Sequence, residues 1–297
     1  MFRKKISYHF YAIIAILGWT LAYVYTKLSL QHYTPISIGF LRYFFASLLL
    51  IPVLIIGRIR PPHKEDFLWF LASATCGFSL YMVVFNIAMT QVTSATSSVI
   101  VATAPIFTAV LAWLLLKEAL KLYQWAAVFM QFCGILVLTL INGSFSSNTG
   151  VLLLLLCPIM LAIYNLIQKK LTRKYSPLQV TAYSILLGTI MLAVFSPTAF
   201  RELKTAPVNQ VINILILGIF SSAIAYVAWT QTLSKAPKTS QVTIYMFLIP
   251  FLSALTGFLI AGEHLELPTV VGGIVIILGM LLFNKDAVVS KAESDAL

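Results

Sequence analysis

The stretch TAPIFTAVLAWLLLKE, residues 103–118, decides the fold, because it sets a proline inside a long apolar run and then recurs. The second copy is LIPFLSALTGFLIAGE, residues 248–263, in which the proline, an alanine and the closing glutamate keep their spacing. Pro250 therefore follows Pro105 by 145 positions. Proline inside an ordinary helix costs about 3 kcal/mol, so its use in both copies predicts one architecture that is built twice.

The composition is that of a membrane protein. Of the 297 residues, 60% are hydrophobic and 10% are charged, and the mean hydropathy is +0.94. Soluble domains carry roughly a quarter charged residues. The net charge of +11 does not indicate a nucleic-acid partner, because the basic residues form short clusters between apolar runs and not a basic face on a soluble fold. We expect the lipid bilayer and a small-molecule solute as partners.

A membrane-spanning helix needs about 20 mostly apolar residues, because the hydrocarbon core is about 30 Å thick. Ten stretches fit this length, which predicts an all-α integral membrane protein with ten transmembrane helices and short connections. The expected spans are residues 9–28, 34–56, 66–87, 93–116, 123–141, 149–169, 177–196, 208–230, 238–261 and 268–284. No cleavage pattern follows the first of them, so we expect it to be retained.

Lysine and arginine divide unequally between the two faces that these spans define. One face holds sixteen of the twenty basic residues, and an excess of basic residues marks the cytoplasmic side. The other face holds Lys27, Arg201 and Lys204, while Arg42 falls within a span. We therefore expect a multi-pass protein of the cell membrane with both termini in the cytoplasm.

The repeat extends through both halves of the chain. The offset of 145 also pairs Tyr81 with Tyr226, and an offset of 142 pairs YTP at 33–35 with YSP at 175–177. Residues 1–145 and 146–297 are thus predicted to form two five-helix repeats, and because five is odd, the second is inverted relative to the first. Inverted repeats are typical of secondary transporters with a solute site near the membrane midplane.

Several of these segments carry a family resemblance. They are GWTLAYVYTKL at 18–28, SIGFLRYFFASLLLIPVL at 37–54, and APIFTAVLAWLLLKEAL with the later GILVL, repeated as IPFLSALTGFLIAGEHL with the later GMLLF. Across essentially its whole length the chain resembles the EamA family within the drug/metabolite transporter superfamily. The resemblance implies a ten-helix carrier that moves small metabolites, commonly outward, through a central cavity, and it does not name the solute.

Polar and aromatic residues inside the spans are the candidates for a solute site. Arg42 is the clearest, because a charge within a span is a functional hypothesis by default, although it can also serve structure or snorkel to the surface. Aromatic residues near span ends can instead form an interfacial belt, and Ser or Thr can pack between helices. The candidate solute-binding residues are Trp19, Tyr23, Arg42, Tyr81, Ser98, Tyr164, Asn165, Tyr226, Trp229, Thr243 and Tyr245.

The two prolines are the candidate hinges. Pro105 and Pro250 fall near the middle of their expected spans, and each follows a polar stretch rich in Ser and Thr. Proline is tolerated in membrane helices where neighbouring groups or water satisfy the freed carbonyl. The functional interpretation is a bend at the cavity, and the alternative is a passive kink that helps packing.

These observations favour a secondary transporter that exports small metabolites, such as amino acids or related compounds, by alternating access between the repeats. We expect no enzyme activity, cofactor or metal. No P-loop is present, which argues against direct use of ATP. One alternative is a polytopic membrane enzyme acting on lipid-linked substrates, but the four histidines are scattered and no HExxH motif occurs. The other is a non-transporting membrane assembly factor, which would not need a polar-lined centre.

Overall fold

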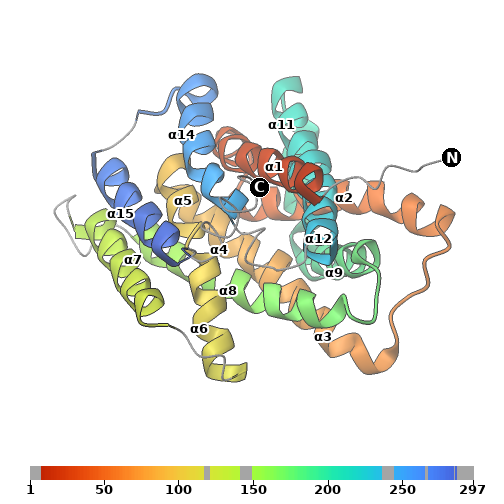
Figure 1. The fold of residues 1–297 in the computed structure, drawn as a ribbon. Helices are drawn as coiled ribbons and strands as arrows, with labels where there is room; N and C mark the ends of the chain where they lie inside the picture. The colour runs from red at the N-terminus through yellow and green to blue at the C-terminus, as the bar shows by residue number, and fades with distance from the viewer. Residues whose placement is uncertain are drawn as a thin grey trace, which may run out of the picture.

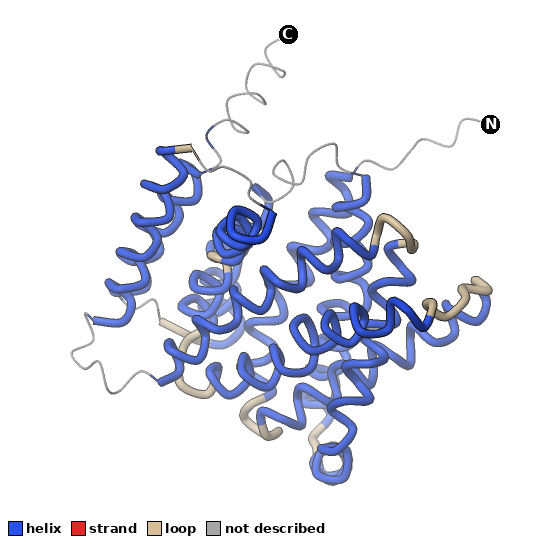
Figure 2. The backbone as a smooth tube through the Cα atoms, turned by 90° about the horizontal axis from the view of Figure 1, so that it is seen from below, coloured by secondary structure: helices blue, strands red, loops and turns tan. Residues whose placement is uncertain are grey.

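The computed structural model describes residues 8–116, 121–140, 149–235, 244–264, 267–283 and 285. This part of the chain is helical throughout its ordered elements (Figure 1), and Figure 2 shows no strand in it. Six helical spans among the described residues are long and apolar enough to cross a membrane. They are Tyr8–Ser29, Pro35–Ile56, Lys64–Met89, Thr149–Leu171, Pro177–Thr205 and Val208–Lys235. The other four expected spans coincide with shorter or only partly described helices, so the count of ten stays a prediction.

The first half runs from α1 to α7. Two long helices are followed by a third span that contains a π-helical turn and a fourth that is divided in two. The elements are α1 Tyr8–Ser29, α2 Pro35–Ile56, η1 Lys64–Asp66, α3 Phe67–Ala74, η2 Thr75–Ser79, α4 Leu80–Met89, α5 Ser94–Val101, α6 Ala104–Leu116 and α7 Leu122–Leu140.

The second half repeats this plan from α8 to α15. Its elements are α8 Thr149–Leu171, α9 Pro177–Leu192, η3 Ala193–Phe195, α10 Ser196–Thr205, α11 Val208–Gly218, η4 Ile219–Ile224, α12 Ala225–Lys235, η5 Ile244–Phe247, α14 Leu248–Ala261 and α15 Leu267–Phe283. The element α10 was expected to be a loop. It is helical because Pro197 occupies its first turn, where proline fits.

The expected proline kinks are instead breaks between separate helical segments. α5 ends at Val101 and α6 begins at Ala104, which makes Pro105 the second residue of a new helix. In the second half a 3₁₀ turn precedes α14, and Pro250 is the third residue of that helix. Proline is tolerated in the first turn because an N–H there has no partner within the helix. Both sites are thus irregular in the structure, and the role of the two prolines as hinges stays a prediction.

Spans 3 and 8 contain π-helical turns at matching places. In the first half η2 lies two residues before Tyr81, and in the second half η4 lies two residues before Tyr226. π-Turns inside α-helices are rare and often mark functional sites, because they displace one carbonyl from the regular ladder. The sequence offset of 145 thus corresponds to an irregularity that both halves share.

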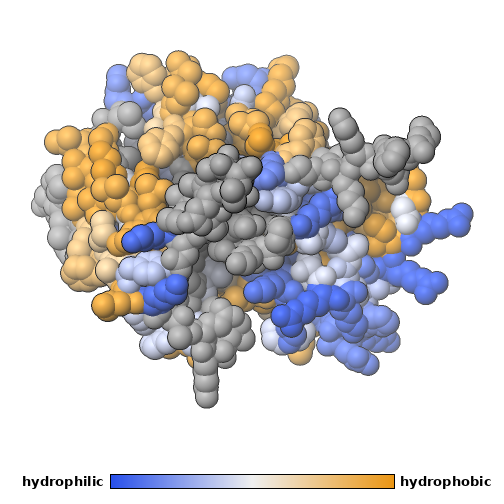
Figure 3. Space-filling view, in the orientation of Figure 1, coloured by the Kyte–Doolittle hydropathy of each residue, from blue (hydrophilic) through white to orange (hydrophobic). Residues whose placement is uncertain are grey.

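The outer surface of the bundle is apolar. Figure 3 shows hydrophobic residues over the left and upper parts of the molecule and hydrophilic ones gathered at the lower right, near α3. At the left, α7 and α15 lie side by side (Figure 1). A Cβ at Gly134 would lie 2.6 Å from Ile276 Cγ1, so this glycine allows the close approach of the two helices. Phe129 and Ile274 remain exposed on this pair, as is expected of helices that face lipid.

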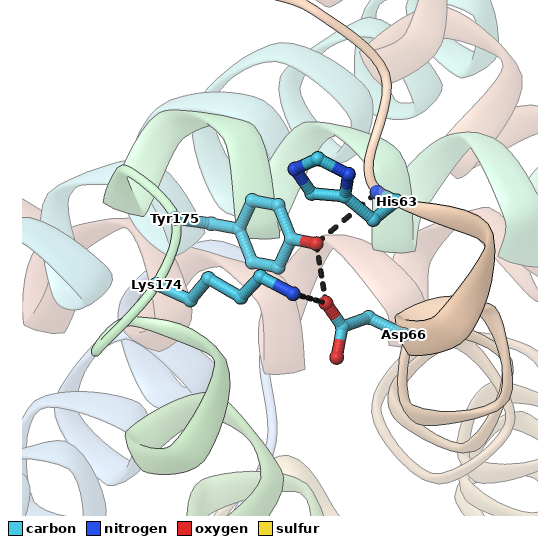
Figure 4. Close-up of polar contacts among 4 residues, drawn as sticks. All are labelled: His63, Asp66, Lys174 and Tyr175. Atoms are coloured by element: carbon cyan, nitrogen blue, oxygen red, sulfur yellow. Dashed lines mark hydrogen bonds and ion pairs between the residues drawn. The ribbon is translucent and has the colours of Figure 1, made fainter.

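Two clusters of polar contacts join the halves at opposite ends of the bundle. In the first, which we call the Asp66 clasp, the carboxylate of Asp66 accepts from Lys174 Nζ at 2.6 Å and from the Tyr175 hydroxyl at 2.5 Å. The same hydroxyl accepts from the backbone N–H of His63 at 3.1 Å (Figure 4). The hydrogen bond to Asp66 raises the pKa of Lys174 above its ordinary value.

The second cluster, the Glu202 clasp, lies at the corresponding connections of the two halves, with the roles of the halves exchanged. Here the acidic residue comes from the second half and its partners come from the connection between α1 and α2. Glu202 Oε2 accepts from the backbone N–H of Thr34 at 3.0 Å, and the Glu202 carbonyl lies 2.9 Å from His32 Nε2. The Asp66 clasp thus joins the start of the third span to the connection between α8 and α9, and the Glu202 clasp joins α10 to the connection between α1 and α2.

Candidate functional site

A cavity lies between the two halves, near the middle of the bundle. The empty space there, including the part that opens to solvent, is about 660 Å³. Its walls come from α1, α2, α4 and α5 of the first half and from α8, α12, η5 and α14 of the second. The site is therefore shared by both halves.

Nine of the eleven candidate residues line this cavity. They are Trp19, Tyr23, Arg42, Tyr81, Ser98, Tyr164, Asn165, Tyr226 and Trp229. Of the other two, Thr243 lies outside the described residues. Tyr245 is not among the lining residues and its hydroxyl bonds His9 Nδ1 near the start of α1. That the nine residues touch the solute stays a prediction.

Seven of the sixteen residues that line the cavity are aromatic. The ring of Trp19 lies 5.3 Å from that of Tyr226 and 5.1 Å from that of Trp229, which places α1 against α12. On the other side, Tyr23 lies 5.6 Å from Phe85, and Phe85 stacks on Tyr81 at 5.7 Å. Edge-to-face and offset pairs of this kind hold rings firmly, so the wall is preformed.

Tyr164 reaches the cavity because Gly77 makes room for it. A Cβ at Gly77 would lie only 2.7 Å from Tyr164 Cε2, so a larger residue there would displace the ring. Tyr164 then packs edge-on against Phe78 at 5.4 Å and against Tyr226 at 6.2 Å. The π-turn η2 thus supplies both the glycine and the phenylalanine that position this ring.

Arg42 provides the charge of the cavity. Its side chain is 2% exposed, and its Nε donates to Ser222 Oγ at 2.5 Å while its Nη2 donates to the Ser221 carbonyl at 3.2 Å. Both acceptors belong to the π-turn η4. Arg42 does not snorkel to the surface, so that alternative was wrong. Among the residues that the structure describes, it forms no ion pair.

Sequence reasoning missed several lining residues, all of them apolar. They are Ala22, Phe85, Val101, Ala102, Leu161, Met246 and Ile249. Some carried a usable signal, because Phe85 lies one helical turn after Tyr81, Leu161 lies one turn before Asn165, and Ile249 immediately precedes Pro250. Apolar residues dominate most small-molecule sites, yet in a chain this hydrophobic they cannot be told from residues that face lipid.

Glu263 links the end of α14 to the start of α5. Its carboxylate accepts from the backbone N–H of Ser94 at 3.1 and 3.0 Å, and its Oε1 also accepts from Ser94 Oγ at 3.1 Å. Ser94 begins α5, and a carboxylate at a helix N-terminus is stabilised by the helix dipole. Gly262 has a φ of 64° and ends α14 with a tight turn, which directs Glu263 toward α5. This contact joins the second half to the first beside Tyr23, whose carbonyl accepts from Ser94 Oγ at 3.3 Å.

Comparison with known proteins identifies the relatives of this chain. It is 30% identical over 270 residues to an uncharacterized transporter of Archaeoglobus fulgidus, covering 91% of this chain and 95% of the relative. It is 25% identical over 282 residues, 95% of each protein, to a probable terminal-alkyne amino-acid exporter of Streptantibioticus cattleyicolor. A solved crystal structure at 16% identity matches with a TM-score of 0.65 and covers 94% of this chain and 98% of that one, which shows a shared fold.

The model of the EamA-like transporter family matches the chain twice, over residues 6–140 and 148–285. This confirms the resemblance found in the sequence, and it indicates a multi-pass membrane transporter and not an enzyme. Because the two matches together cover nearly the whole chain, it belongs to the EamA-like transporter family.

Proposed function

We propose that this transporter exports small metabolites, such as amino acids or related compounds, across the cell membrane as a secondary transporter. The observation that carries the proposal is the cavity between the halves, where aromatic rings surround one buried arginine. A cavity of this kind fits a solute that has both a charged group and an apolar body. One relative is named a probable terminal-alkyne amino-acid exporter, which supports the same class of solute.

Alternating access between two inverted five-helix repeats is the proposed mechanism. One end of the cavity must be closed while the other opens, and the contact of Glu263 with Ser94 is suited to close the end that we assign to the cell exterior. The helix breaks before Pro105 and Pro250 are the proposed hinges, because the chain there lacks part of the regular hydrogen-bond ladder. The clasps at Asp66 and Glu202 would keep the connections that they join fixed.

Counterflow in proteoliposomes tests the proposed function. Vesicles containing the purified protein and loaded with an unlabelled amino acid, amine or nucleoside are given a trace of the same labelled compound outside. We expect transient accumulation of label with amino acids or related compounds, because a carrier exchanges its solute across the membrane without net energy input. No counterflow with any of the three classes would contradict the proposal.

Single-cysteine labelling tests the orientation. Thr90 and Ser234 are both exposed and lie at the C-terminal ends of the spans Lys64–Met89 and Val208–Lys235, which face opposite sides of the membrane in the expected topology. In a background without the three native cysteines, Thr90→Cys is expected to react with an impermeant maleimide on intact cells, and Ser234→Cys only after permeabilisation. The excess of basic residues on the Ser234 side is the physical reason. Labelling of Ser234→Cys on intact cells would overturn the assignment of the cytoplasmic face.

Glu263→Gln tests the closure at α5. The amide keeps the shape of the side chain but loses the charge that attracts the first N–H groups of α5, so the closed state is weakened by about 1 kcal/mol. We expect a cysteine at Ser98, which is fully buried at the cavity wall, to be labelled from outside about fivefold faster than in the parent protein. The measurement is the rate of maleimide reaction in intact cells.

Pro250→Ala is the comparison for this experiment. It leaves Glu263 and Ser94 unchanged and restores one backbone donor at the proposed hinge. Counterflow is expected to slow while labelling from outside does not accelerate. If both variants leave the labelling of Ser98→Cys unchanged, Glu263 does not close the cavity and the assignment of that end as a gate is wrong.

A further inference from the structure

The π-turn η4 leaves one backbone carbonyl without its helical partner. In a regular α-helix the N–H of Ala225 would donate to the carbonyl of Ser221, four residues earlier. Here it donates to the carbonyls of Phe220 and Ser222 instead. The carbonyl of Ser221 is therefore available to another donor, and it accepts the hydrogen bond from Arg42 Nη2. The irregular turn thus creates an acceptor inside the protein.

One edge of the Arg42 guanidinium is hydrogen-bonded to η4, and the other edge is left for a ligand. The Ser222 hydroxyl and the Ser221 carbonyl together take one N–H from Nε and one from Nη2, and Nη1 approaches Met82 Sδ at 3.8 Å. A guanidinium has five N–H donors, so two remain for a ligand. Nη1 and Nη2 form a planar fork, the geometry that binds a carboxylate with two parallel hydrogen bonds.

A positively charged group on a solute would find no oppositely charged side chain among the described residues of the cavity. No aspartate or glutamate is among the described residues that line it. An ammonium group would meet aromatic faces, whose attraction is about 0.5–2 kcal/mol, and neutral acceptors such as the Asn165 side-chain oxygen, and it would also be repelled by Arg42. A buried charge without a partner is costly, and an incoming anion would remove that cost.

The two halves differ at the positions that hold this charge. With the offsets of the repeat, Arg42 corresponds to Ser184 and Ser222 corresponds to Gly77. The turn η2 has the same π geometry, with Leu80 N–H donating to the Thr75 carbonyl, but it receives no arginine. Ser184 instead bonds the hydroxyl of Ser73 at 2.9 Å. The charged anchor therefore occurs on one side of the cavity and not on the other.

We infer that Arg42 of α2, which is hydrogen-bonded to the π-turn η4, is a subsite for the carboxylate of the solute, and that Ser222 is the residue that positions it. In this assignment an ammonium group on the solute is not required. The solute class is then organic carboxylates with an aromatic or aliphatic body, to which amino acids belong without being the only members. This inference rests on the proposed function, because it assigns the chemistry of the same cavity.

Three probes with one carbon skeleton test this assignment: 3-phenylpropanoate, 3-phenylpropanamide and 3-phenylpropylamine. The purified protein in detergent is titrated with each probe, and the rise of its thermal unfolding midpoint gives the affinity. We expect the carboxylate to bind at least tenfold more tightly than the amide, and the amine to bind less tightly than the amide. This comparison needs no variant, so it stands even if a substitution impairs folding.

Variants of the turn separate positioning from general packing. Ser222→Ala is expected to weaken binding of 3-phenylpropanoate about tenfold and to leave binding of the amide unchanged. Ser222→Thr keeps the hydroxyl, so it is expected to bind 3-phenylpropanoate as tightly as the wild type does. Ser184→Ala removes the corresponding serine of the other half and is the matched control, with wild-type binding expected. An amine that binds as tightly as the carboxylate, or a Ser222→Ala protein that keeps the full preference for the carboxylate, overturns the inference.

Counterflow of the same probes distinguishes this inference from the proposed function. Binding that is selective for the carboxylate, without counterflow of any probe, would support the subsite and contradict transport. Counterflow of the amine as fast as that of the carboxylate would support transport and overturn the subsite.

Discussion

Arg42→Ala is expected to reduce counterflow of a carboxylate solute by about 100-fold. The side chain is buried and supplies the only charge that lines the described part of the cavity. Removing one partner of a buried, hydrogen-bonded charge pair costs about 2–5 kcal/mol, which at the lower end is a factor of about 30 and at the upper end more than 1,000. Initial rates of counterflow in proteoliposomes at a solute concentration below the half-saturation value measure this effect.

Arg42→Lys is the graded control for the same position. Lysine keeps the charge but loses the planar fork, so it cannot donate to Ser221, Ser222 and a carboxylate together. We expect partial transport, between the wild type and Arg42→Ala. If Arg42→Ala yields no folded protein while Arg42→Lys folds and transports normally, the arginine is structural and the solute does not depend on its geometry.

Gly77→Ala is expected to have the largest effect on stability. The new Cβ would lie 2.7 Å from Tyr164 Cε2, so the ring would have to leave its packing against Phe78 and Tyr226. Overpacking of this kind costs about 1–3 kcal/mol. The thermal unfolding midpoint in detergent should fall, and transport should fall with it because Tyr164 is displaced from the cavity wall.

A second substitution shows whether the ring is the cause. In the double variant Gly77→Ala with Tyr164→Ala, the clash is absent, so the unfolding midpoint should lie above the value expected if the two single effects were additive. Simple additivity would mean that Gly77 acts on the π-turn itself and not through Tyr164. Gly188→Ala is a useful comparison, because its Cβ would meet Phe78 Cβ at 2.7 Å and would reach Tyr164 only through that neighbour.

The sequence predicted the helical elements and most cavity residues for one physical reason. In spans this apolar, a polar or aromatic residue such as Asn165 or Trp19 is conspicuous, and it is expensive unless it faces a cavity or another helix. The hydrophobic runs likewise define the spans to within a few residues, as at α2 and α8. The repeat then placed these residues on corresponding helices of the two halves.

Other features had no sequence signal. A π-turn depends on one shifted hydrogen bond, and FSLY after Gly77 and AIAY after Ser222 do not reveal it. The prolines predicted irregularity, but not that the chain would end one helix and begin another, because that depends on contacts with neighbouring helices. Tyr245 shows the opposite failure. It is an aromatic residue inside an expected span, yet its hydroxyl is hydrogen-bonded to His9 near the start of α1.

The mismatch between Arg42 and Ser184, and between Ser222 and Gly77, has an evolutionary consequence. The double match to one family model indicates a duplicated ancestor. A symmetric pair of identical subunits must repeat every residue on both sides, so it would bring two guanidinium groups toward one cavity, where like charges repel far more strongly than in water. In one continuous chain the two halves can differ at corresponding positions, and here arginine stands at position 42 while serine stands at 184. Under the proposed carboxylate subsite, a solute would then have one orientation in the cavity.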